Sequence, residues 1–133
     1  MRYTTVIIIS LSVLYLSSCQ EDFEVRLERE AQIFTSKQCP IEIEPGCILD
    51  SVSFSTKQRT YIWWYKLSDK GIHIIRENTP ILHSLLVERV KDNIDLKILK
   101  DKYINFGYVY RSNNYKDSVI YETTIYPKEY NIK

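Results

Sequence analysis

The sequence is poor in the residues that many catalytic and binding sites require. Only three glycines occur (Gly46, Gly71 and Gly107), too few and too widely spaced for a loop that cradles phosphate. The two histidines, His73 and His83, lack the His-x-x-His and His-Glu-x-x-His spacings of a metal site, and we expect them on different elements. We therefore expect no metal and no cofactor.

An excess of charge of one sign is also missing. The chain has 18 basic and 17 acidic residues, and the two sets are equal at 17 once Arg2, in the leader described below, is set aside. Proteins that bind nucleic acid rely on clustered positive charge to contact the phosphates. The composition therefore gives no reason to expect a nucleic-acid partner.

No apolar run is long enough to span a membrane. Val6 to Leu16 supplies about eleven largely apolar residues, whereas a transmembrane helix needs about 20. With Arg2 before it, the run is typical of a secretory signal peptide. The leader ends in Leu16-Ser17-Ser18-Cys19, which resembles the lipobox of bacterial lipoproteins: a branched apolar residue, two small residues and the cysteine that receives the lipid.

This resemblance implies that residues 1–18 are a lipoprotein signal peptide and that residues 19–133 form the mature protein. Cys19 would carry a diacylglyceryl thioether, and two or three acyl chains such as palmitate would hold the protein stably on a membrane. The alternative is an ordinary signal peptide with a chance cysteine. About 115 mature residues predict one small domain.

The residues after Cys19 bear on location. Gln20-Glu21-Asp22 resembles the acidic export signal of surface lipoproteins of the Bacteroidota. The alternative is a solvated helix start, because acidic side chains are favourable near a helix N-terminus. We expect an outer-membrane lipoprotein of the cell envelope, facing either the surface or the periplasm.

Two further cysteines, Cys39 and Cys47, form an even pair in an oxidising compartment, which predicts a disulfide. Such a short loop would contribute about 2.5 kcal/mol. The alternative is two free thiols. A zinc site is not expected, because no second cysteine or histidine pair lies at ligand spacing.

Periodicity and turn residues predict the following elements: a helix over 22–37, strands over 48–56 and 60–67, an ambiguous segment over 72–76, a helix over 80–92 that begins at Thr79-Pro80, a short helix or turn over 93–101, strands over 103–111 and 118–126, and a loose tail over 128–133.

The order of helix, hairpin, helix, hairpin predicts an α+β fold. We expect an antiparallel sheet of about four strands, made of two hairpins, with helices packed on one face. A lipobox, a Cys-Pro, a tyrosine-rich strand, a leucine-rich helix and a closing Phe-x-Tyr-x-Tyr strand together resemble small lipoproteins of the secretion-pilotin type. No diagnostic motif accompanies this likeness, so it implies no binding residue.

Aromatic residues are the unusual feature, since nine of the eleven tyrosines lie in the mature chain. Strand alternation puts Tyr61, Trp63 and Tyr65 on one face and Ile62 and Trp64 on the other. Most such rings pack beneath helices. If one of the two faces is bare, it is the candidate binding surface. The candidate binding residues, taken over both faces, are Tyr61, Trp63, Trp64 and Tyr65.

Signs of catalysis are weak. Glu42 and Glu44 could present two carboxylates, and three serines (Ser51, Ser53 and Ser55) share a strand face without a histidine nearby in sequence. We therefore expect no enzyme. The preferred hypothesis is a lipoprotein that binds a protein partner at the envelope, as an assembly accessory or immunity-type factor. The alternatives are a surface glycan-binding module and, more remotely, a small hydrolase.

Overall fold

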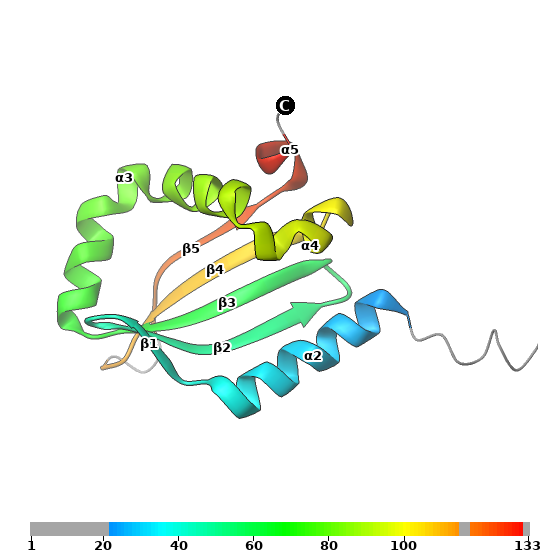
Figure 1. Cartoon of the computed structure of the whole chain (residues 1–133). Coiled ribbons are helices and arrows are strands. Elements are labelled where there is room, and N and C mark those ends of the chain that lie inside the picture. Colours follow the sequence, from blue (N-terminus) through cyan, green and yellow to red (C-terminus); the bar gives the residue numbers. More distant parts are fainter. Residues whose placement is uncertain (1–21, 115–117, 132–133) are drawn as a thin grey trace, which may run out of the picture.

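A computed structural model of the chain describes residues 22–114 and 118–131 (Figure 1). Cys19 and the leader lie outside the described residues, so the predicted lipidation stays a prediction. The strands are β1 (Ile41–Glu44), β2 (Cys47–Ser55), β3 (Thr60–Leu67), β4 (Asn105–Ser112) and β5 (Val119–Ile125). The helices are α2 (Phe23–Gln38), α3 (Asp69–Asp92), the 3₁₀ helix η1 (Ile94–Leu96), α4 (Lys97–Asp101) and α5 (Pro127–Tyr130).

The strands form one mixed sheet in the order β1-β2-β3-β4-β5. Neighbouring strands are antiparallel except β3 and β4, which run parallel with Thr60 opposite Asn105 and Leu67 opposite Ser112. A parallel pair needs a long crossover, which α3, η1 and α4 supply. The α+β class is confirmed, but the expected sheet of about four antiparallel strands is corrected to five strands with one parallel pair.

Helix α3 extends over the segment that we expected to be broken. Ser68 caps its start by accepting a hydrogen bond from the Gly71 N–H at 3.4 Å, and Pro80 lies inside it. The helix bends in its middle (Figure 1), as a proline that lacks an N–H and crowds the preceding turn explains. Pro80 thus marks a bend and not a helix start. His73 and His83 consequently lie on one helix, contrary to our expectation of different elements.

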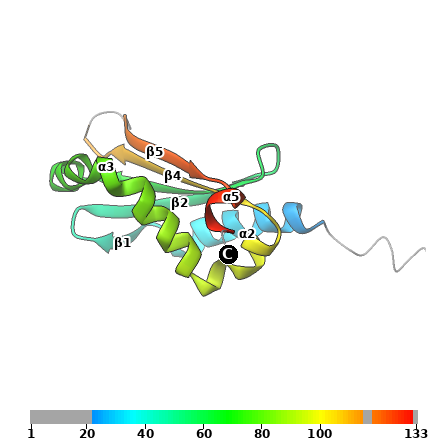
Figure 2. The same ribbon diagram turned by 90° about the horizontal axis from the view of Figure 1, so that it is seen from above.

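The helices of residues 22–114 and 118–131 lie on one side of the sheet (Figure 2), which confirms that part of the prediction. The largest fully buried side chains fill the space between the layers: Leu67, Leu86, Val90, Ile104, Phe106 and Ile125. The chain end also joins this core, because Tyr130 of α5 is buried and its hydroxyl donates to the Ile104 carbonyl at 2.7 Å. The expectation of a loose tail is therefore wrong for Lys128–Tyr130. Within the described ranges, no helix is long and apolar enough to cross a bilayer.

The predicted Cys39–Cys47 disulfide is not formed, and both residues are free thiols. Cys39 ends α2, whereas Cys47 begins β2. Ile41 pairs with Leu49, so the register carries Cys39 to the level of Ser51, about 13 Å along β2 from Cys47 at ~3.3 Å per residue. A disulfide requires Cα atoms within about 7 Å. The prediction was wrong because the two cysteines, although close in the sequence, lie far apart along the β1–β2 pair.

Candidate functional site

A groove runs over the helix-covered side of the sheet, between α2 and the segment formed by η1 and α4. We call it the interhelical groove. Its volume is about 620 Å³. Side chains from both walls and from the sheet line it: Phe23, Arg26, Leu27, Glu30, Ala31, Phe34, Leu49, Val52, Tyr61, Trp63, Asn93, Asp95, Leu96, Ile98 and Leu99.

Two of the candidate aromatic residues, Tyr61 and Trp63, form the floor of this groove. The Trp63 ring stacks on Tyr108 at 4.8 Å between centroids and meets Tyr61 edge-on at 5.1 Å. Burial raises the pKa of Tyr61 to about 12, with Cys39 and Glu30 adding to the rise. The floor is therefore a fixed, uncharged aromatic surface.

The rims of the groove carry exposed apolar side chains. Phe34 on α2 is 38% exposed and Ile98 on α4 is 65% exposed. A single exposed apolar residue is ordinary, but apolar residues on both rims of an apolar depression mark an interaction surface. Charges frame one end, where the cations of Arg26 and Lys102 lie over the Phe23 ring, 5.6 and 5.4 Å from its centroid.

Tyr65 lines a different, smaller cavity of about 150 Å³, which we call the tyrosine pocket. Its partner in the parallel pair of strands, Tyr110, lines the same cavity, together with Arg89 of α3. The two phenol rings stack at 4.7 Å with 12° between their planes. Tyr65 thus lines a different cavity from Tyr61 and Trp63.

Trp64 lies on the opposite face of the sheet, which no helix covers in the described part of the chain (Figure 2). Its Nε1 donates to Ser53 Oγ at 2.9 Å, and the guanidinium of Arg111 lies 4.5 Å above its ring. It borders a shallow hollow of about 530 Å³ with Ile62 and Val109. The four candidate binding residues therefore belong to three separate surfaces, so they do not make one site.

His83 belongs to a cluster that sequence reasoning missed. Its Nδ1 lies 2.7 Å from Thr123 Oγ1, and its Nε2 lies 2.6 Å from Glu129 Oε1. The backbone N–H of Tyr126 also donates to Glu129 at 2.8 Å. The order hydroxyl, imidazole, carboxylate is that of a hydrolase triad. Because the groups come from α3, β5 and α5 and join these elements, we interpret the cluster as a structural clamp.

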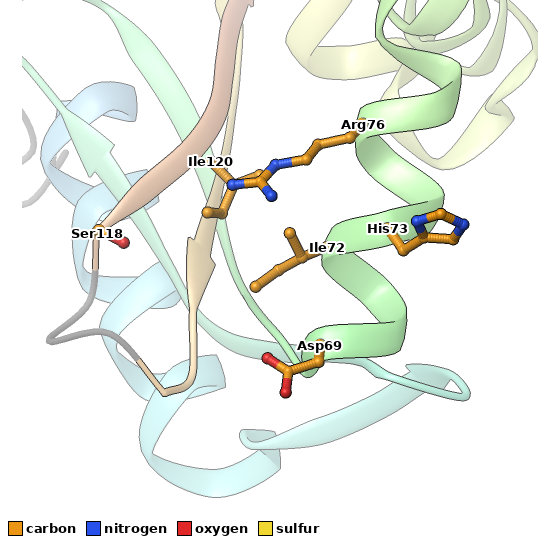
Figure 3. A pocket seen from close by; sticks show the side chains of 6 residues that line it. All are labelled: Asp69, Ile72, His73, Arg76, Ser118 and Ile120. Carbon is orange, nitrogen blue, oxygen red and sulfur yellow. The ribbon is translucent and has the colours of Figure 1, made fainter.

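A further hollow of about 550 Å³ lies between the first turns of α3 and β5 (Figure 3). Arg76 reaches across it toward Ile120, while the His73 ring turns away from it. At one end Asp69 accepts a hydrogen bond from the Asn114 amide at 3.0 Å. This hollow therefore brings together no nucleophile and base, as activated nucleophiles require.

The remaining catalytic candidates form no recognisable site. Glu42 and Glu44 are exposed on β1, and the Ser53 hydroxyl of β2 accepts a hydrogen bond from Trp64. Among residues 22–114 and 118–131, no group of three histidine, cysteine, aspartate or glutamate side chains is placed to hold a metal ion.

The comparisons with solved structures concern the fold. A candidate secreted protein from Pseudomonas aeruginosa has a TM-score of 0.65 at 10% identity, covering 83% of this chain and 98% of its own. The pilotin EpsS of the Vibrio vulnificus type 2 secretion system gives 0.60 at 12%, covering 83% and 93%. The type II secretion system pilotin AspS of Vibrio cholerae gives 0.56 at 14%, covering 80% and 90%.

These likenesses support the pilotin-type resemblance of the sequence at the level of the fold, which is as far as such low identities reach. No curated protein matches the sequence significantly. A family match spans residues 22–121, from the start of α2 into β5, and so includes the interhelical groove and the tyrosine pocket. The chain belongs to the family described as "Domain of unknown function (DUF8479)".

Proposed function

We propose that this protein is a non-enzymatic lipoprotein, anchored through Cys19, that binds a protein partner at the cell envelope as an assembly accessory or immunity-type factor. The interhelical groove is the docking surface. The observation that carries the proposal is the combination of an aromatic floor, Tyr61 and Trp63, with exposed apolar residues on two facing rims, Phe34 and Ile98. Aromatic anchors beneath apolar rims are the usual core of a protein interface.

The form of the groove favours a helical ligand. One wall is α2, whose 16 residues give it a length of ~24 Å at ~1.5 Å per residue. A partner helix of similar length could lay its apolar stripe on the floor, with anchors three and four residues apart. Its polar face would then meet the charged side chains at the groove margin, among them Arg26, Glu30 and Asp95.

The fold comparison supports an accessory role. Two of the solved structures with this fold are pilotins of type II secretion systems, and the leader of this chain independently resembles that of an envelope lipoprotein. The identity of the partner does not follow from a shared fold, because one fold serves many functions.

The test is co-purification of the full-length chain from its own cells after mild crosslinking and detergent extraction, followed by mass spectrometry. A stoichiometric envelope protein should co-purify with the wild-type chain and be lost from Ile98→Glu and Phe34→Glu, because a charge in the groove must be desolvated on binding. Ile81→Glu is the matched control, since Ile81 is an exposed isoleucine on a helix outside the groove.

Retention of the partner by both groove variants would reject the groove as the docking surface. Loss of the partner from Ile81→Glu as well would show that any added negative charge on this protein prevents co-purification, whatever its position. Circular dichroism should first establish that each variant folds. Anchoring is tested separately by Cys19→Ala, which should move the protein from the membrane fraction to the soluble fraction; continued membrane association would reject lipidation at Cys19.

Glycan binding is the second candidate, favoured by the bare sheet face around Trp64. Trp64 is half-buried, and the part of its ring left open on this face could stack on a sugar, while the neighbouring hollow has polar side chains such as Glu122 and Thr124. This role predicts a change in tryptophan fluorescence with a polysaccharide panel that is lost in Trp64→Ala. If the panel leaves the fluorescence unchanged, the glycan hypothesis fails.

A further inference from the structure

The tyrosine pocket is a second site, separate from the interhelical groove. It lies where the turn between β1 and β2 meets α3, and the two sites share no lining residue among those described. Most of its wall is apolar, with Leu67 from β3 and Ile75, Leu82 and Leu86 from α3. At about 150 Å³ it resembles in size a cavity that holds one benzene molecule.

Two buried phenols give this pocket a polar end. Tyr65 and Tyr110 are 8% and 5% exposed, and their hydroxyls make no hydrogen bond with any described residue. Burial raises the pKa of each phenol far above its ordinary value, with neighbouring phenols adding to the rise and Arg89 opposing it. Both groups are therefore protonated hydrogen-bond donors without a protein partner, and because neither hydroxyl oxygen is among the fully buried unpartnered atoms, a ligand in the pocket can reach them.

Arg89 supplies a positive charge at the same end. Its guanidinium makes no ion pair or hydrogen bond within the described residues, yet its charge acts on the hydroxyls of Tyr65 and Tyr110 and on the Cys47 thiol. Burial raises the pKa of Cys47 to about 11, so the thiol is neutral and does not compete for the cation. Glu44 is the one carboxylate in the lining, at the β1 side.

We propose that the tyrosine pocket binds a small monocarboxylate with a compact apolar body of about six to nine non-hydrogen atoms. The carboxylate would accept hydrogen bonds from the hydroxyls of Tyr65 and Tyr110 and pair with Arg89, whose planar guanidinium matches a carboxylate. The apolar body would pack against Leu82 and Leu86. A free organic acid and the C-terminus of a peptide with an apolar last residue offer the same chemistry.

The test uses the purified full chain in a zwitterionic detergent, with benzoate as the probe and titration calorimetry or ligand-observed NMR as the readout. Benzoate should bind at one site, with benzyl alcohol and benzylamine at least about tenfold weaker because they lack the anion. A second probe is a short peptide ending in leucine, with either a free or an amidated C-terminus.

Arg89→Gln should weaken the binding of whichever probe is accepted by about tenfold or more. The double variant Tyr65→Phe with Tyr110→Phe should also weaken it, and should fold because it removes only hydroxyls that have no protein partner. Arg76→Gln is the matched control on the same helix, outside the pocket, and should leave the affinity unchanged.

Benzoate binding that depends on Arg89 supports the proposal and identifies a free acid as the ligand source. Binding of the free-carboxyl peptide alone, lost on amidation, supports it and identifies a chain terminus. The proposal is overturned if neither probe binds at millimolar concentration, if Arg89→Gln changes nothing, or if benzylamine binds best, which would make Glu44 the anchor. These outcomes are independent of the groove, so the proposed function can stand or fall separately.

Discussion

The hydroxyl of Thr35 bonds both backbone groups of Val52: it donates to the carbonyl oxygen at 2.8 Å and accepts from the N–H at 2.9 Å. The pairing of β1 with β2 ends at Leu49, so Val52 lies on a part of β2 that no outer strand covers. A helix side chain thus takes the place of the missing strand. This contact fixes α2 against the sheet and sets the position of one wall of the interhelical groove.

Thr35→Val should therefore destabilise the protein, although the two side chains have nearly the same shape, because valine cannot make these hydrogen bonds. Both Val52 groups lose their partner at a partly buried position, which should lower the free energy of unfolding by about 1–3 kcal/mol. Urea denaturation measures this change. Thr35→Ser keeps the hydroxyl and should fall much closer to the wild type. A Thr35→Val variant as stable as the wild type would show that the two hydrogen bonds contribute little.

The thiols make a second prediction. Since Cys39 and Cys47 are free, mass spectrometry of the unfolded, unreduced protein should find both alkylated. In the folded state Cys47 should react slowly near neutral pH and faster as the pH approaches its raised pKa of about 11. Neither Cys39→Ser nor Cys47→Ser should cost the 2–4 kcal/mol that is typical of a lost disulfide. A mass lower by two hydrogens before alkylation would contradict this prediction, because it would show that the two cysteines form a disulfide.

Local patterns in the sequence predicted the elements that are locally encoded. The apolar stripe of Phe23, Leu27, Ala31 and Phe34 predicted α2 to within a residue at each end, and alternation with a polar break predicted β2 and β3. The same alternation correctly separated Trp63 from Trp64. These features follow from neighbours in the chain, so a single sequence contains them.

Features that depend on distant partners were not predictable in this way. Strand β1 is four residues long and exists because it pairs with β2. Pro80 is a good first helical residue in isolation, and only the packing of Ile72 and Leu82 on the same core shows that the helix continues through it. The tyrosine pocket needs Tyr65, Tyr110 and Arg89 to meet across a parallel strand pair, which no spacing in the sequence reveals.

The contact between Gly46 and Gly71 makes a third prediction. A Cβ atom at Gly71 would lie 2.2 Å from the Gly46 carbonyl oxygen, a backbone atom that cannot move aside alone. Gly71→Ala should therefore destabilise the protein by about 1–3 kcal/mol or more and displace the turn that walls the tyrosine pocket. Gly107→Ala is the control, because its Cβ would meet side chains of Ile62 and Thr60 at 3.2 and 3.3 Å, which can shift. Thermal unfolding compares the two.

The clamp around His83 makes a prediction about pH. Burial tends to raise the pKa of Glu129, but the Tyr126 N–H and the His83 ring outweigh it, and the net pKa lies below its ordinary value. A carboxyl whose pKa is lower in the folded state stabilises the protein above its unfolded pKa of about 4.3. That stability is lost as the pH falls through the folded pKa.

Glu129→Gln should consequently lower the melting temperature at neutral pH and leave a shallower fall in stability on acidification. Thermal melts across the acidic range measure this. Glu88→Gln is the control, since Glu88 is an exposed carboxylate on the same helix as His83 and should leave the profile unchanged. If the melting temperature falls equally with acidification in Glu129→Gln and the wild type, the Glu129 carboxylate does not contribute to the pH dependence of stability.

The adjacent tryptophans should separate stability from binding. Trp63 stacks on Phe106 and Tyr108 in the layer beneath the helices, so Trp63→Ala should cost about 3–5 kcal/mol. Trp64 contacts Ser53 and Arg111 on the bare face, and Trp64→Ala should cost about 1–2 kcal/mol through one hydrogen bond and one cation–π contact. Denaturation curves of both variants test the contrast.

The same two variants separate the binding hypotheses. A glycan site should disappear in Trp64→Ala while the fold survives, whereas loss of a protein partner in Trp63→Ala is interpretable only where that variant is still folded. If Trp64→Ala proves the more destabilising of the two, the main role of Trp64 is to hold the sheet together, and a loss of glycan binding in that variant would not identify a binding residue.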